Sequence, residues 1–120
     1  MNSEQKKRFA AALERVSGDC DLLVAMAAMV TEDAPSIWQE VKVHLEAEEW
    51  QEVAASGHKL KGMLSTFDTG TPIPELQEMI AAARRERVSE VNACFDNCRR
   101  DVERLIQEVA ELGAMSTNGC

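Results

Sequence analysis

The sequence predicts an all-α fold, an up-and-down four-helix bundle with an additional short N-terminal helix. Apolar residues recur every three or four positions through most of the 120 residues, which is the spacing of amphipathic helices. No segment alternates like a half-buried strand, and segments with glycine or proline divide the chain into pieces of helical length. The length suits one hydrophobic core. We therefore expect a single domain over residues 1–113 and a flexible C-terminal tail over residues 114–120.

The composition indicates a globular protein with an acidic surface. Hydrophobic residues make up 45% of the chain and charged residues 28%, and the formal net charge is −8. This charge argues against general nucleic-acid binding and against binding to anionic membranes. The first residues are polar, so no signal peptide is expected, and the longest apolar run, Leu22–Val30, is too short to span a membrane. We expect a cytoplasmic protein with neither nucleic acid nor membrane as a partner.

The first half of the chain predicts a short helix and then a longer, interrupted one. Residues Ser3–Val16 form an amphipathic pattern, and Asp19 is suited to cap the next helix, which starts at Cys20. Pro35 follows a polar interruption, so this helix either restarts or kinks there. Helical spacing then continues to about Ala47.

The second half predicts three helices. One runs from about Glu49 to Phe67, and the glycine- and proline-rich segment Asp68–Pro74 is the clearest loop in the sequence. A short helix follows, with inward-facing apolar residues between Leu76 and Ala83. The last helix has a regular apolar stripe from Val88 to Leu112, with alternating steps of three and four, and Gly113 ends it. Such a narrow stripe is typical of a helix packed nearly antiparallel in a bundle.

The four cysteines predict neither a metal site nor a catalytic thiol. Nothing points to export, so no disulfide framework is expected. Cys94 and Cys98 share a helix face, but no second pair and no suitably spaced histidine completes a zinc site. We interpret them as reduced thiols beside the core. Neither Cys20 nor Cys120 has a recognisable base partner.

His58 is the candidate functional residue. It lies about 140° around the helix from Val53, well away from the apolar face. Gly62, one turn later, costs the helix about 1 kcal/mol relative to alanine. An outward imidazole among small residues suits the close approach of another surface. The expected docking patch around it is made of Ala54, Ala55, Lys59, Gly62 and Ser65.

The neighbours of His58 favour phosphate chemistry over other roles. Hydrolysis is disfavoured because no carboxylate and no glycine-rich loop lies within one helical turn of His58 in the sequence, and Lys59 and Lys61 would repel a metal cation. Lys61 is on nearly the same face and can reach an anion carried by the imidazole. A neutral ring nitrogen can attack a phosphoryl group and later release it. An incidental surface histidine stays open as an alternative, and we interpret His44 in that way.

The segment His58–Gly62 resembles the H-x-x-K-G core of histidine-containing phosphotransfer (HPt) domains, which carry phosphate in two-component phosphorelays. The resemblance covers roughly Gly18–Val109. Two positions differ from the family's pattern: Met63 stands where a small residue is usual, and Asp68 where glycine is usual. The other matching segments are Gly18-Asp19 with Leu22-Leu23, Glu32-Asp33-Ala34-Pro35, Glu48-Glu49-Trp50, and Phe67.

The resemblance implies an HPt-like bundle in which His58 is the phosphorylated residue. Lys61 would steady the phosphoryl oxygens, and Gly62 would leave room for the partner. The implied partners are a receiver (response-regulator) domain and a sensor histidine kinase. Mg²⁺ and the acidic pocket that drive transfer would belong to the receiver, so this chain would be a monomeric phosphoprotein without cofactor or metal, a phosphoryl carrier rather than an enzyme.

Two alternatives remain at the level of sequence. The chain could be an HPt-like adaptor that docks without carrying phosphate. It could also be a helical interaction module whose stripe from Val88 to Leu112 pairs with another chain.

Overall fold

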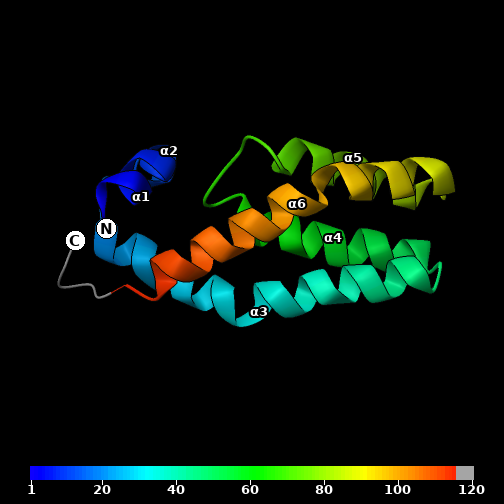
Figure 1. Cartoon of the computed structure of the whole chain (residues 1–120), viewed down its shortest axis with the longest axis horizontal. Helices are drawn as coiled ribbons and strands as arrows, with labels where there is room; N and C mark the ends of the chain where they lie inside the picture. The colour runs from blue at the N-terminus through cyan, green and yellow to red at the C-terminus, as the bar shows by residue number, and fades with distance from the viewer. Residues whose placement is uncertain (116–120) are drawn as a thin grey trace.

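The computed structural model describes residues 1–115, and in this part of the chain every element of secondary structure is a helix. The prediction of an all-α fold is therefore confirmed. Figure 1 shows the helices in chain order. They are α1 (Ser3–Arg8), α2 (Ala10–Arg15), α3 (Cys20–Glu46), α4 (Trp50–Leu64), α5 (Ile73–Arg84) and α6 (Val88–Gly113).

The four longer helices lie side by side in a molecule that measures 46 × 22 × 20 Å (Figure 1). α4 packs between α3 and α5, and α6 packs against both α3 and α5. The short helices α1 and α2 lie at the end that holds the start of α3 and the end of α6 (Figure 1). In residues 1–115, no helix is long and apolar enough to cross a membrane.

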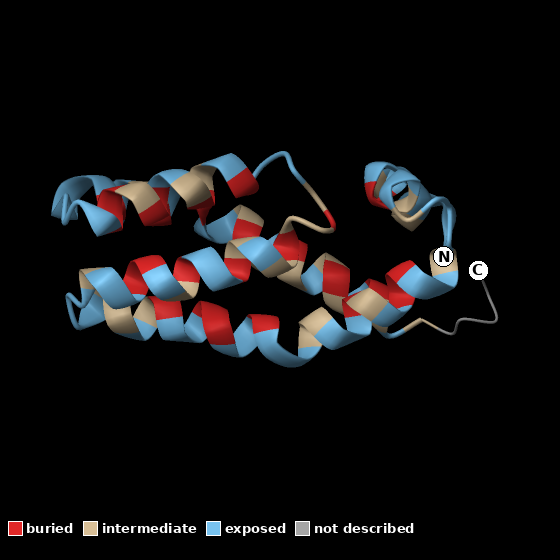
Figure 2. Ribbon diagram, turned by 180° about the vertical axis from the view of Figure 1, so that it is seen from behind, coloured by how far each residue is buried: buried red, intermediate tan, exposed pale blue. Residues whose placement is uncertain are grey.

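The apolar stripe of α6 is buried inside the molecule. Figure 2 shows the buried residues on the inward sides of the long helices. Of the residues in the predicted stripe, only Val88 is exposed to solvent, at 42%. Because this stripe packs within the chain, it is not exposed for the pairing with a second chain that the interaction-module alternative requires. The buried members of the stripe are Val91, Phe95, Cys98, Val102, Leu105, Val109 and Leu112.

The contact between α3 and α6 centres on an aromatic pair. The rings of Trp38 and Phe95 stack with their centroids 5.3 Å apart. The indole N–H of Trp38 donates to Oε2 of Glu103 over 2.9 Å, and Nζ of Lys42 lies 2.8 Å from the same oxygen. The hydrogen bond from Lys42 lowers the pKa of Glu103, and the hydrogen bond from Trp38 lowers it further.

α3 continues through Pro35, so of the two predicted alternatives the structure has the kink rather than the restart. Proline has no N–H to donate to the carbonyl of Thr31, which weakens the helix at that point. The hydroxyl of Thr31 donates to the carbonyl of Ala27 over 2.7 Å. Figures 1 and 2 both show that α3 bends near its middle.

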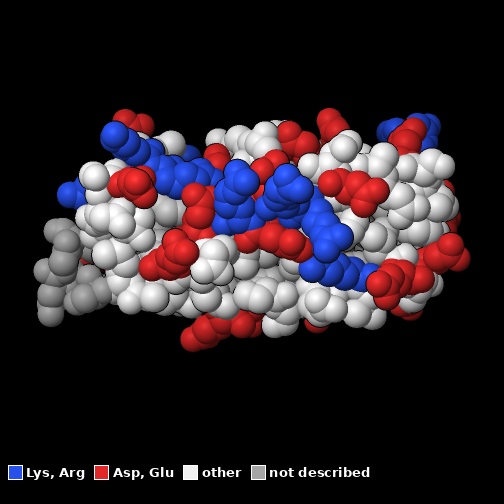
Figure 3. Space-filling view, viewed as in Figure 1, with Lys and Arg blue, Asp and Glu red and all other residues white. Residues whose placement is uncertain are grey.

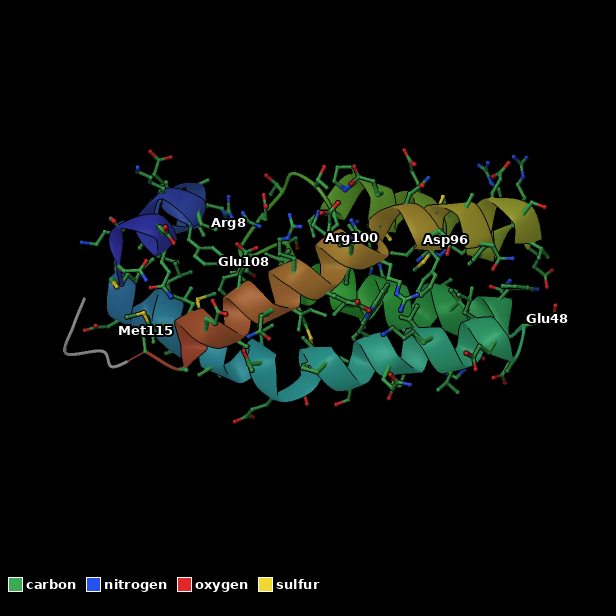
Figure 4. The ribbon with its side chains drawn as sticks, in the orientation of Figure 1. Arg8, Glu48, Asp96, Arg100, Glu108 and Met115 are labelled. Atoms are coloured by element: carbon green, nitrogen blue, oxygen red, sulfur yellow. The ribbon has the colours of Figure 1, made fainter. Side chains whose placement is uncertain are left out.

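The N-terminal segment forms two short helices, not the single helix that was predicted. They meet at Phe9, which is buried and contacts Phe67 edge to face, with the ring centroids 6.2 Å apart. Arg8 fixes the same segment. Its guanidinium lies 2.7 Å from Oδ2 of Asp68 and 3.1 Å from Oε2 of Glu108 (Figure 4). The chain therefore turns at Phe9, whose side chain packs in the core, and this turn divides the expected helix in two.

α6 ends at Gly113 as predicted, but this glycine also has a packing role. A Cβ at this position would lie 2.7 Å from the backbone nitrogen of Ala28, so only glycine permits the approach of α6 to α3. Two residues of the predicted tail belong to the end of this helix. Ala114 caps α6, and Met115, labelled in Figure 4, packs against the core. The rest of the predicted tail, 116–120, lies outside the described residues.

Two turns with the same geometry connect the long helices. Residues 47–49 join α3 to α4, and residues 85–87 join α5 to α6. Glu48 has a φ of 58° and Glu86 a φ of 55°, both in the left-handed region that glycine usually occupies at helix ends. The N–H of Arg87 donates to the carbonyl of Ala82 over 3.0 Å, which closes the second turn.

Replacing Glu86 by glycine should stabilise the protein by about 1 kcal/mol, because an L side chain is strained at positive φ. Urea denaturation measures the change in free energy of unfolding. The control is Glu40→Gly, which should destabilise the interior of α3 by about 1 kcal/mol. Destabilisation by both substitutions would contradict the strain at Glu86.

Candidate functional site

His58 lies in α4 with its side chain exposed to solvent. Val53, Gly57 and Leu60 are buried on the opposite side of the helix, as the periodicity predicts. The imidazole forms no hydrogen bond or ion pair with any other residue in the described part of the chain. Both of its ring nitrogens are therefore available to a group from outside the molecule.

The packing of α4 on α5 places His58 along the seam between these helices. A Cβ on Gly57 would lie 3.0 Å from Cγ1 of Ile80, so the two helices approach closely there. One turn further along α4, Nζ of Lys61 donates to Oε1 of Gln77 over 2.6 Å. These two contacts set an antiparallel register in which His58 lies at the level of Gln77–Ile80 on α5.

Lys61 is held by a residue that the sequence analysis missed. Its side chain is half-buried against α5, with Gln77 as its hydrogen-bond acceptor. An ammonium group has three N–H donors, so two stay available for an anion. Gln77 lies far from His58 in the sequence, and only the register of α5 on α4 brings it to the site. No local pattern could have identified it.

Four of the five residues in the predicted docking patch reach the surface. Ala55, Lys59 and Gly62 are exposed, and Ser65 is half-exposed. The prediction for Ala54 is wrong, because it is only 3% exposed. Ala54 lies two turns before Lys61 on the same flank of α4, and α5 covers that flank.

The two glycines of α4 have different environments. A Cβ at Gly57 would crowd Ile80 and Met79, so packing on α5 explains that glycine. A Cβ at Gly62 would meet nothing within 4 Å. No contact inside the described chain requires glycine at position 62, although glycine weakens the helix. The structure therefore leaves open space beside His58.

The two residues that depart from the family pattern are engaged within the chain. Met63 is half-buried and packs against the core. Asp68 accepts a hydrogen bond from Arg8 over 2.7 Å and another from the backbone N–H of Gly70 over 2.8 Å. Neither contact buries His58, which is exposed to solvent.

The thiols and the second histidine offer no comparable site. Burial raises the pKa of Cys94, and it raises the pKa of Cys98 to about 12, so both are protonated at neutral pH. Cys20 is disulfide-bonded, against the expectation of no disulfide.

The second histidine has a partner within the chain, because Nδ1 of His44 lies 3.1 Å from Oε1 of Glu49. Within residues 1–115, no group of three or more histidine, cysteine or acidic side chains could hold a metal ion.

Basic side chains of α6 lie close to acidic ones. Figure 3 shows Lys and Arg side chains as a band across this face of the molecule, with acidic side chains along its edges. Arg99 lies 3.7 Å from Glu103, and Arg104 lies 3.8 Å from Asp101. Figure 4 labels another acidic and basic residue of α6, Asp96 and Arg100, which are one turn apart. A hollow of about 380 Å³ lies between α5 and α6, and its lining does not include His58.

The arrangement at α4 therefore combines an unpartnered imidazole, a positioned cation and open space at Gly62. Such a surface suits reaction with a group that another protein presents, because His58 is exposed and does not line the hollow between α5 and α6. Comparisons of the chain with protein-family models, with curated proteins and with solved structures found no match.

Substituting Gly62 by alanine should raise the free energy of unfolding by about 1 kcal/mol, because alanine favours the helix and meets nothing there. Gly113→Ala should lower it, because the new Cβ would collide with the backbone of Ala28. Thermal and urea denaturation of the two variants measure the contrast. Destabilisation by Gly62→Ala would mean that position 62 has a structural role in the isolated chain.

Proposed function

We propose that this chain is a histidine phosphotransfer protein, which accepts a phosphoryl group on His58 and passes it to or from a receiver-domain aspartate in a two-component phosphorelay. The observation that carries the proposal is the exposed, unpartnered imidazole three residues from a lysine that Gln77 holds at 2.6 Å. The proposal also includes the finer fold, in which α3 to α6 form the up-and-down bundle of an HPt domain and α1 and α2 are an N-terminal addition.

The transfer step needs only a neutral imidazole on this chain. The unprotonated ring nitrogen of His58 attacks the phosphorus of the partner's aspartyl phosphate. The N–P bond forms as the P–O bond to the aspartate breaks, and the aspartate leaves as a carboxylate. Transfer in the other direction reverses these steps. The receiver supplies Mg²⁺ and the acidic pocket, so this chain carries the phosphoryl group without being an enzyme.

Lys61 stabilises the charge of the phosphoryl oxygens in this proposal. Its ammonium is already oriented by the hydrogen bond to Gln77, so less side-chain freedom is lost when an anion binds. Gln77 is a positioning residue, because it acts through Lys61. Because Gln77 holds Lys61 against α5, the imidazole of His58 stays exposed to the partner.

The partner's active site would close over the seam of α4 and α5. Ala55, Lys59, Gly62 and Ser65 form the docking patch, and Ala54 is excluded because it is buried. A receiver domain or a sensor histidine kinase in the cytoplasm is the proposed partner. Met63 and Asp68, the two departures from the family pattern, make their contacts within the chain and leave His58 exposed, which is compatible with phosphoryl transfer at His58.

Replacement of His58 by glutamine should abolish the acid-labile phosphate that the chain acquires from a phosphorylated receiver domain. The matched control is His44→Gln, which removes the other histidine and should leave labelling unchanged. Radiolabel transfer from a panel of receivers measures the difference. Equal labelling of the native chain and the His58→Gln variant would contradict the proposal. The absence of labelling by every receiver in the panel would contradict it as well.

Lys61→Ala should slow transfer about tenfold or more, because it removes a charge-assisted hydrogen bond to the phosphoryl group. Gln77→Ala should have a smaller effect in the same direction, and the surface control Lys7→Ala should have none. Rapid-quench transfer rates, with circular dichroism to verify helicity, test this order. Unchanged kinetics for Lys61→Ala would make it an ordinary surface lysine.

A further inference from the structure

The outer face of α3 carries most of the large apolar side chains that the described residues expose. Leu22 is 46% exposed, Met29 69% and Val43 52%. The remaining exposed large hydrophobic residue is Val88 on α6, at 42%. Intervals of seven and fourteen residues place the three side chains of α3 on one side of the helix. Scattered single residues would need no explanation, but this alignment along one helix does.

Acidic side chains occupy the same face between the apolar ends. Glu32, Asp33 and Glu40 are all exposed. None of them forms an ion pair or hydrogen bond with another side chain in the described part of the protein. Their charges are therefore not neutralised within the chain, unlike that of Glu103 on α6, which lies 2.8 Å from Lys42.

This face is separate from the surface around His58. α3 packs on α4 and α6, and its outer face points away from the interior that these helices share. His58 lies instead on the side of α4 that meets α5, as the contact between Lys61 and Gln77 indicates. A protein bound along α3 would leave the imidazole accessible.

We propose that the outer face of α3 docks a basic amphipathic helix of a partner protein. The seven-residue spacing of Leu22 and Met29 is that of a seam along which a second helix lies at a shallow angle. Apolar side chains of the partner contact the two ends of the face, and its lysine or arginine residues meet the acidic centre.

The acidic charges on α3 favour a basic helix over a second copy of the chain, nucleic acid or an anionic membrane. In a symmetric antiparallel pair of two copies, the acidic centre of one α3 would face that of the other, which like-charge repulsion opposes. Nucleic acid and anionic membranes are repelled for the same reason. The proposal does not depend on phosphorylation of His58, so it can hold or fail independently of the proposed function.

The test is an NMR titration of the full, isotope-labelled chain with two synthetic helical peptides as long as α3. They share one leucine pattern, but one carries lysine and the other glutamate at the polar positions that flank it. The lysine peptide should shift the amide signals of residues 22–43 and leave those around His58 unchanged. The glutamate peptide should bind at least about tenfold more weakly, because it meets the acidic centre with like charge.

Two variants locate the contact. Met29→Ser should weaken the lysine peptide about tenfold, whereas Val88→Ser, the matched loss of an exposed apolar side chain elsewhere, should have no effect. Several results would overturn the proposal: no binding, equal binding of both peptides, or shifts centred on α4 and α5. A dimer in sedimentation that Met29→Ser dissociates would assign the face to a second copy of the chain instead.

Discussion

The close packing of α4 on α5 determines the geometry of the candidate site. Gly57 permits it, because a side chain there would press on Ile80. The register that follows brings Gln77 to Lys61 and covers Ala54, while the next position after Gly57 turns His58 to the solvent. One glycine in the core thus permits the contact that orients the face around His58. A slip of α5 along α4 would separate Lys61 from its acceptor Gln77.

Periodicity was sufficient for the elements whose apolar residues repeat regularly. The stripe of α6 from Val91 to Leu112 is buried as predicted, and the exposure of His58 follows from its angle to Val53. Both predictions depend only on spacing within one helix, which tertiary contacts do not alter. For that reason the all-α fold and the orientation of the histidine were accessible from the sequence.

The errors arose where a contact distant in sequence decides the outcome. Ala54 is buried because α5 covers one flank of α4, and Gln77 enters the site through the same contact. Phe9 divides the N-terminal segment because it packs against Phe67, which no local pattern indicates. At Pro35 the sequence left a kink and a restart open, and distant contacts also decide between them, because the packing of α3 on both sides outweighs one lost hydrogen bond. Helical periodicity describes one element at a time and contains none of these contacts.

The distribution of charge links the two proposed surfaces. The chain has a net charge of −8, yet the residues beside His58 are Lys59 and Lys61, while the outer face of α3 holds unpaired carboxylates. In the two proposals, an acidic active site that carries a phosphoryl group would be attracted to the histidine and repelled by α3, and a basic helix would have the opposite preference. The same charges would direct each partner to its own face and keep it from the other. Both proteins could then occupy the molecule at once, because neither competes for the surface that suits the other.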